Sequence, residues 1–120
     1  MRTRDSRITL RQMRDHAREA LDMIRNRVRA DLDSDRMLNL ALVRLLEILG
    51  EAANRVLPEE RADYRGIPWP QLSGLRNRLI HEYDNVDFDI LWQILNQDLP
   101  PLLRELERIV PEEPGSPPGL

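Results

Sequence analysis

The sequence predicts an all-α fold, and three observations support this prediction. Apolar residues recur at helical spacing in four segments. No segment alternates apolar and polar residues with the enrichment in β-branched residues that is typical of strands. The 120 residues suffice for one domain with a hydrophobic core and are too few for two ordinary domains. We therefore expect a single up-and-down bundle of four to five helices.

The first helix is expected from about Ser6 to Arg29. Its predicted core stripe is Leu10, Met13, Ala17, Leu21, Ile24 and Val28. The opposite face carries arginines, and half of the 18 arginines of the chain lie in residues 1–30. Either this face attracts phosphate or, as we expect for most of these arginines, it is a solvated face paired with the acids of the helix.

The second helix is expected after the capping candidates Asp33 and Ser34, and Pro58 should stop it near Leu57. Its predicted core stripe is Met37, Ala41, Leu45, Ile48, Ala52 and Val56. A second apolar set widens this stripe: Leu38, Leu42, Leu46 and Leu49. Because the apolar surface is so wide, the helix should be buried on more than one side.

A loop with several turn-forming residues follows, among them Tyr64, Gly66, Pro68 and Pro70. It leads into a third predicted helix at about Gln71–His81. The residues expected to be buried there are Leu72, Leu75 and Leu79. Trp69 should pack where the loop meets this helix.

Asp87 is a candidate N-cap for a fourth helix with the apolar residues Ile90, Leu91, Ile94 and Leu95. Pro100 and Pro101 must interrupt or kink this helix, because proline has no backbone N–H. A helical stripe continues beyond them at Leu102, Leu103, Leu106 and Ile109, so the two pieces should form one bent arm. We expect the domain to span residues 1–110 and the Pro- and Gly-rich residues 111–120 to form a disordered tail.

The composition excludes several classes of protein. Without cysteine, the chain can form neither a disulfide framework nor a thiolate metal site. No apolar run approaches the roughly 18 residues that a membrane span needs, and the first residues do not resemble a signal peptide. The net charge of -3 is not that of a general nucleic-acid coat protein. We expect a cytoplasmic protein.

His81 lies in the segment RNRLIHEYD, which combines histidine with arginine. Cleavage of RNA without a metal needs a group that accepts the 2′-hydroxyl proton, a donor for the leaving oxygen and positive charge at the phosphate. Histidine suits the proton steps because it titrates near neutral pH, and the guanidinium of Arg76 suits a phosphate because it can bind two oxygens. His16, in contrast, is expected on the surface without a role.

The spacing of these two residues poses a geometric problem. On an ideal helix Arg76 and His81 point about 140° apart, whereas Asn77 shares the face of His81. Either the helix frays at its end or a second copy completes the site. Two copies about a twofold axis could place two histidines and two arginines around one cleft.

A purely structural explanation of the segment also exists. Arg76 could form an ion pair with Glu82 or Asp84. His81 could cap the end of the helix, and Tyr83 could pack on the bundle.

A longer pattern favours the functional interpretation. The segments LLEILGEAANRV and IPWPQLSGLRNRLIHEYDNVDFDILWQILNQDLPPLLREL resemble the HepT family of HEPN-domain toxins over about residues 40–110. The centre of this resemblance is an Arg-x4-His-x-Tyr signature with Asn after the Arg, which Arg76, Asn77, His81 and Tyr83 match. Supporting matches are Gly50-Glu51-Ala52, Ile67-Pro68-Trp69 and Asp98-Leu99-Pro100.

The resemblance implies a HEPN-like homodimer that cleaves RNA as a metal-independent endoribonuclease, without a cofactor. Arg76 would stabilise the scissile phosphate, His81 would be the general acid and base, and Asn77 would orient His81 or the RNA. The resemblance also implies a type VII-like toxin–antitoxin system, in which an MntA-like minimal nucleotidyltransferase is the antitoxin. Tyr83 would be the hydroxyl that this partner modifies with AMP, which adds charge and bulk beside His81.

The chain also departs from the family pattern. Asp84 stands where an aromatic residue is expected, and the first 35 residues carry no family signature. The Gly50-Glu51-Ala52 element is expected to be a close helix–helix contact with a buried or interfacial Glu51 rather than a catalytic site. The alternative function is a catalytically weak helical module that binds a nucleotidyltransferase partner, which the negative charge favours and the intact Arg76 and His81 oppose.

Overall fold

The computed structural model describes residues 2–81 and 85–112, with side chains from Ser6 onward. Its helices are α1 (Arg2–Met23), α2 (Asp31–Ser34), α3 (Arg36–Arg55), α4 (Pro58–Arg61), α5 (Trp69–Ser73), α6 (Leu75–Leu79), α7 (Phe88–Gln93), the π-helix η1 (Ile94–Asp98) and α8 (Leu99–Ile109). The only β-type pairing in the described part of the chain is an isolated antiparallel bridge between Ile80 and Val86. The all-α prediction is confirmed.

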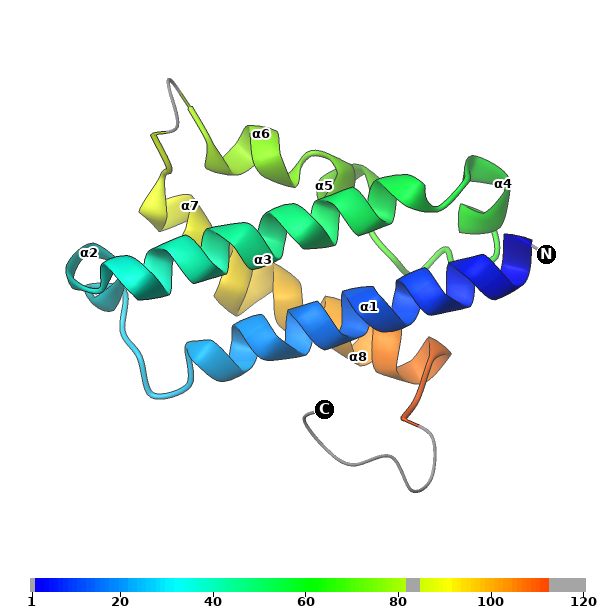
Figure 1. Cartoon of the computed structure of the whole chain (residues 1–120), viewed down its shortest axis with the longest axis horizontal. Helices are drawn as coiled ribbons and strands as arrows, with labels where there is room; N and C mark the ends of the chain where they lie inside the picture. Colours follow the sequence, from blue (N-terminus) through cyan, green and yellow to red (C-terminus); the bar gives the residue numbers. More distant parts are fainter. Residues whose placement is uncertain (1, 82–84, 113–120) are drawn as a thin grey trace.

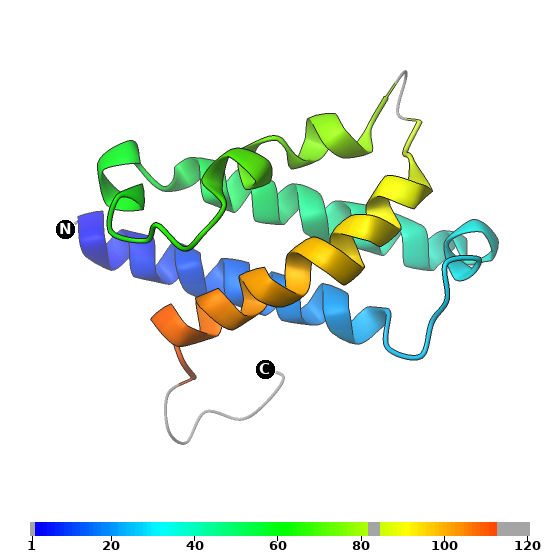
Figure 2. The ribbon, with the colours of Figure 1, turned by 180° about the vertical axis from the view of Figure 1, so that it is seen from behind.

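The helices form two layers. The long helices α1 and α3 lie side by side in one layer, and α5 and α6 lie along the edge of α3 (Figure 1). The continuous arm of α7, η1 and α8 crosses behind α1 and α3, as the reverse view shows (Figure 2). The shortest dimension of the molecule is 19 Å, close to two helix diameters of about 10 Å each.

The first helix is shorter than predicted. α1 ends at Met23, and Asn26 adopts a φ of 63°, a left-handed conformation that asparagine tolerates and that ends a helix. Val28 therefore lies in the following loop and is 62% exposed, although it was predicted to continue the core stripe. The rest of that stripe was predicted well, since Leu10, Met13 and Ala17 are fully buried.

The second predicted helix corresponds to α3, and the short α2 before it, which contains the predicted caps Asp33 and Ser34, was not predicted. The cap of α3 is Asp35 rather than Asp33 or Ser34: the Asp35 carboxylate accepts a hydrogen bond from the Leu38 N–H at 3.0 Å. The predicted centre of its core stripe was also wrong. Met37 is 83% exposed, whereas Ala52 and Val56, at the other end of the predicted stripe, are buried as predicted. The residues that were predicted only to widen the stripe are also buried: Leu38, Leu42, Leu46 and Leu49. Pro58 does end the helix, and it also begins α4.

The third predicted helix is divided in two. α5 ends at Ser73, and Gly74 separates it from α6. Leu72, Leu75 and Leu79 are buried as predicted. Trp69 packs where the loop meets α5, and its indole N–H donates a hydrogen bond to the Tyr64 carbonyl at 3.1 Å.

The C-terminal arm contains a wide turn in place of a sharp kink. Asp87 caps α7 as predicted, and the arm continues through η1, where the Leu99 N–H donates to the Ile94 carbonyl five residues earlier. Pro100 and Pro101 follow in the first turn of α8, where a missing N–H is tolerated. Val110 is fully buried. Residues 113–120 of the expected tail lie outside the described residues, and the division at residue 110 stays a prediction.

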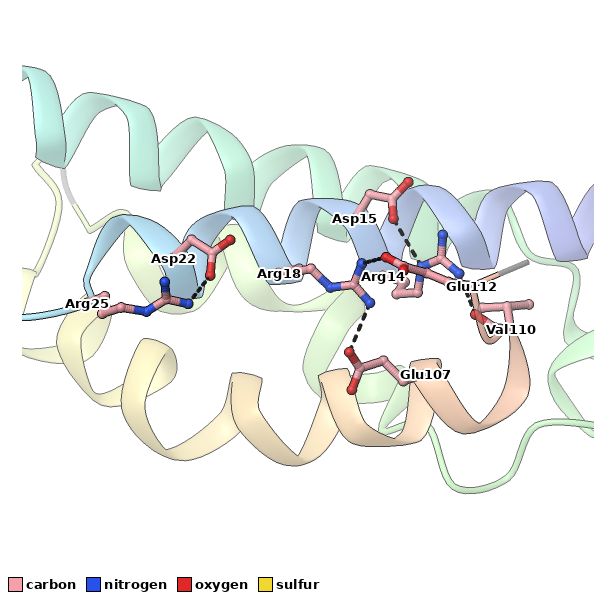
Figure 3. Close-up of polar contacts among 8 residues, drawn as sticks. All are labelled: Arg14, Asp15, Arg18, Asp22, Arg25, Glu107, Val110 and Glu112. Carbon is pink, nitrogen blue, oxygen red and sulfur yellow. Dashed lines mark hydrogen bonds and ion pairs between the residues drawn. The ribbon is translucent and has the colours of Figure 1, made fainter. Parts of the chain in front are cut away.

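Arginines of α1 hold the end of α8, and we call this set of contacts the C-terminal clamp (Figure 3). The Arg14 guanidinium donates to the Val110 carbonyl at 2.5 Å and to the Asp15 carboxylate at 3.0 Å. Arg18 bonds to Glu107 at 2.9 Å and also to Glu112. These arginines are thus paired, as expected, but most of their partners lie on α8 or just after its end rather than on their own helix.

Among the helices that the structure describes, none combines the length and the apolar character needed to cross a membrane.

Candidate active site

The site is built on α6, which is anchored to α3 by a close approach at Gly50. A Cβ atom at Gly50 would lie 3.1 Å from the Leu72 carbonyl oxygen and 3.7 Å from the Leu75 Cβ. This confirms the predicted helix–helix contact of the Gly50 element. Glu51, however, is not buried, because its side chain is 59% exposed. α6 buries Leu75 and Leu79, and of the residues between them Arg76 and Asn77 are exposed.

Arg76 is one of these exposed residues, and its guanidinium is only loosely held. Its side chain is 72% exposed, and its Nε lies 3.9 Å from the nearer carboxylate oxygen of Glu47. Glu47 lies at a similar distance, 3.8 Å, from Arg44. A pair at this distance and exposure contributes little to stability, so Arg76 can exchange its carboxylate for a phosphate at small cost.

Arg76 and Asn77 line the same hollow between α3 and α6, with a volume of about 300 Å³. Its other lining residues are Leu46, Glu47, Gly50, Glu51, Asn54, Leu72 and Ser73. On an ideal helix Asn77 would share the face of His81, but the structure places Asn77 at the hollow of Arg76. The amide can therefore contact a ligand that Arg76 binds.

His81 lies beyond the end of α6, which was predicted to include it. The helix ends at Leu79, and Ile80 is extended, with φ -106° and ψ 120°. Of the two geometries left open by the sequence, the end of the helix does unwind. His81 donates its backbone N–H to the Asn85 carbonyl at 3.0 Å.

The imidazole of His81 contacts Asp87. Its Nε2 lies 3.3 Å from the Asp87 Oδ2, and the ring is half-exposed. The pKa of the Asp87 carboxyl is lowered, first by the hydrogen bond from the Ile90 N–H and further by His81 and the Asp89 N–H. Asp87 was predicted only as a helix cap, and this second contact was missed.

Arg76 and His81 do not touch each other within one copy. Of the described residues, Glu47 is the partner of Arg76 and Asp87 is the partner of His81. The structural alternative for His81 is not observed, because His81 contacts Asp87 rather than capping α6. Glu82, Tyr83 and Asp84 lie outside the described residues.

The other histidine, His16, is partly buried rather than at the surface. Its Nδ1 is enclosed without a hydrogen-bond partner in the described structure. Within the part of the chain that is described, no group of three or more His, Cys, Asp or Glu residues is arranged to hold a metal ion.

Comparison with known proteins gives one family over nearly the whole chain. Residues 4–109 match the profile described as "Ribonuclease HepT-like". A protein of Methanocaldococcus jannaschii named "Putative RNase" is 31% identical over 107 residues, which cover 89% of this chain and 98% of the relative. A protein of Thermococcus cleftensis named "Probable ribonuclease HepT" is 32% identical over 95 residues. The matched region covers 76% of this chain and 86% of the relative.

A further relative, from Caldanaerobacter subterraneus subsp. tengcongensis, is also named "Putative RNase". It is 36% identical over 83 residues, which cover 69% of this chain and 74% of the relative. No solved structure gives a significant match.

Proposed function

The chain belongs to the HepT-like ribonuclease family, and on this basis we propose that it is a metal-independent endoribonuclease that acts through Arg76 and His81. The observation that carries the proposal is the state of these two side chains. Arg76 is exposed and held only at 3.9 Å, and His81 is half-exposed with one ring nitrogen facing a carboxylate. Both are free to meet an RNA backbone.

The roles follow from the chemistry of each group. The guanidinium of Arg76 binds the scissile phosphate and stabilises the charge that develops on its oxygens. His81 accepts the proton of the attacking 2′-hydroxyl. Asn77 lines the same hollow as Arg76 and contacts the RNA beside that phosphate.

We further propose that the enzyme works as a homodimer in the region of α3 and α6. Arg76 and His81 do not meet within one copy, and a second copy can bring the two groups together. An apolar surface lies beside the site. Met37 and Leu40 are 83% and 51% exposed, and they precede Arg44 and Glu47 on one stripe of α3 at helical spacing.

A mixing experiment tests whether the two copies share the site. Arg76→Ala and His81→Ala proteins, each inactive alone, are unfolded, mixed and refolded together. If one copy supplies Arg76 and the other supplies His81, mixed dimers recover part of the wild-type activity. If the mixture stays inactive while light scattering shows dimers, each site belongs to one copy.

The partner proposed for this protein is an MntA-like nucleotidyltransferase antitoxin that transfers AMP to Tyr83. Tyr83 is two residues from His81 in the sequence, so an adenylyl group there would place negative charge where RNA phosphate must bind. Growth arrest on cytoplasmic expression, relieved by the partner, would support a toxin. Mass spectrometry should then find one AMP on the peptide with Tyr83 and none in Tyr83→Phe.

The experiment that tests the central proposal is incubation with total RNA and tRNA in EDTA. Wild-type protein should produce fragments, and neither His81→Ala nor Arg76→Ala should. Arg108→Ala is the matched control, because Arg108 is as exposed as Arg76 but is bound to Glu105. Intact RNA in the wild-type lane, with Tyr83 shown to be unmodified, would leave the helical binding module as the better function.

A further inference from the structure

The segment that carries His81 is held against the start of α7 by backbone pairing. The Ile80–Val86 bridge is flanked by hydrogen bonds from the His81 N–H to the Asn85 carbonyl, at 3.0 Å, and from the Asp87 N–H to the Leu79 carbonyl, at 2.9 Å. In such an antiparallel pair, positions 81 and 87 are diagonal neighbours on one face. The contact between their side chains is therefore set by the backbone.

The carboxylate of Asp87 is itself fixed in orientation. Its Oδ1 accepts hydrogen bonds from the backbone N–H groups of Asp89, at 2.9 Å, and Ile90, at 3.1 Å. This is the N-cap of α7, and it leaves Oδ2 pointing away from the helix. Oδ2 is the atom that lies 3.3 Å from the His81 Nε2.

We propose that Asp87 is the positioning residue of this site, which holds His81 through Nε2 and leaves Nδ1 as the nitrogen that takes the proton from RNA. The inference rests on the proposed function. An ionised carboxylate is only an acceptor, so the nitrogen that faces it must carry a proton. In the neutral imidazole the lone pair then lies on Nδ1, on a ring that is half-exposed.

The proton transfer balances without a metal. Nδ1 takes the 2′-hydroxyl proton as the 2′-oxygen bonds to phosphorus, and the bond from phosphorus to the 5′-oxygen breaks. The departing 5′-oxygen takes a proton from the protonated His81 of the second copy or from water. Asp87 keeps its negative charge throughout and lies beside the imidazolium that forms.

The charged groups around Asp87 make a matched control available. Asp89 is adjacent on the same helix turn, but its carboxylate bonds to Arg29 at 2.8 Å and not to His81. Arg29 also bonds to Asp33 at 3.0 Å. Asp89→Asn therefore removes a negative charge near the site without removing the contact with the imidazole.

The decisive variant is Asp87→Asn. Asparagine is as good an N-cap as aspartate, so its oxygen should stay on the α7 amides and its NH₂ should face His81. A donor opposite Nε2 requires a lone pair on Nε2, which moves the ring proton to Nδ1. We expect kcat for RNA cleavage to fall at least about a hundred-fold with KM little changed. Asp89→Asn should stay within about two-fold of the wild type.

The tautomer gives a readout that does not depend on cleavage. Ring-nitrogen NMR at a pH where the imidazole is neutral should find the proton of His81 on Nε2 in the wild type and on Nδ1 in Asp87→Asn. His16 serves as an internal control that should not change. Asp87→Ser keeps a capping oxygen and offers nothing to Nε2, so its kcat should fall only about ten-fold.

The outcomes separate this inference from the proposed function. If the wild type does not cleave RNA but His81 carries its proton on Nε2, the proposed ribonuclease function is wrong and the contact between Asp87 and His81 is confirmed. If the wild type cleaves RNA and carries the proton of His81 on Nδ1, the inference is wrong. It is equally overturned if folded Asp87→Asn keeps the wild-type kcat. The wild-type spectrum needs no variant, so a failure of Asp87→Asn to fold would not block the test.

Discussion

The guanidinium of Arg14 and that of Arg76 lie in opposite environments within one chain. Arg14 is 8% exposed and is bound to a backbone carbonyl and a carboxylate, whereas the Arg76 side chain is 72% exposed and has a single partner at 3.9 Å. Arg108 lies between these extremes: its side chain is 70% exposed, yet it forms two hydrogen bonds to Glu105, at 2.6 and 3.1 Å. The strength of the pairing, rather than exposure, thus distinguishes an arginine that is available to a ligand.

The largest expected effect is the loss of activity in Arg76→Ala. Removing a positive charge that meets the phosphate in the transition state should lower kcat/KM by about a thousand-fold, because such interactions contribute a few kcal/mol. The thermal midpoint should stay close to that of the wild type, since the pair with Glu47 is long and exposed. Cleavage rates and thermal melting of the same sample check both parts. A large loss of stability would mean that Arg76, like Arg14, stabilises the fold.

Arg14→Ala should show the reverse behaviour. It leaves the buried Val110 carbonyl without its donor and removes a packed side chain, which should cost about 2–3 kcal/mol of unfolding free energy. Urea unfolding measures this loss. Activity per folded molecule should be unchanged, and Arg108→Ala is the control for removing an arginine. If Arg14→Ala is as stable as Arg108→Ala, the C-terminal clamp does not stabilise the fold.

Gly50→Ala tests how tightly the site is anchored. In the interior of a helix this change usually stabilises by about 1 kcal/mol. Here the new Cβ would lie 3.1 Å from the Leu72 carbonyl oxygen, and overpacking costs about 1–3 kcal/mol. We expect a net destabilisation near 1 kcal/mol in urea unfolding. Gly74→Ala is the control, because its Cβ would meet its nearest atom at 3.4 Å; a stabilised Gly50→Ala would show that α5 can retreat from α3.

The smallest expected effect concerns Glu105, which holds Arg108. Its hydrogen bond from Arg108 lowers the pKa of the Glu105 carboxyl below the ordinary value of 4.5. A carboxyl with a lowered pKa contributes stability above its unfolded pKa and loses it as the pH falls through its folded pKa. Glu105→Gln should therefore slightly flatten the loss of thermal stability below about pH 4.5. If the loss of thermal stability at low pH is the same in Glu105→Gln as in the wild type, the pair of Glu105 and Arg108 does not contribute to stability.

Local sequence patterns predicted those parts of the structure that local chemistry decides. Leu72, Leu75 and Leu79 are buried, and Asp87 caps a helix, because spacing and capping act over a few residues. α3 shows where this fails: apolar residues surround most of it, so the pattern did not decide between Met37 and Leu38 for the core. The packing of α3 against α1 decides it.

The residues of the candidate site stay a prediction from the sequence, and their contacts could not be predicted from it. Arg76, Asn77 and His81 were recognised as a family signature, which no spacing rule supplied. The contact between His81 and Asp87 depends on the antiparallel pairing of Ile80 with Val86, which the spacing of apolar residues does not reveal. The bond from Arg14 to Val110 joins residues 96 positions apart, so no local pattern could have indicated it.

The wide turn at Ile94–Asp98 has a consequence for how this chain can vary. A π-helix holds one residue more than an α-helix needs for the same turn. Deleting one residue there would restore regular α-helical hydrogen bonding and would leave α8 in phase with α7. Deleting one residue from the regular turns of α7 would instead rotate α8 by about 100° relative to the start of α7. After such a deletion in α7, Leu102 and Leu106 would leave the core, and the carbonyl of Val110 would turn away from Arg14. A single-residue deletion should therefore be tolerated at Ile94–Asp98 far better than in the regular turns of this arm.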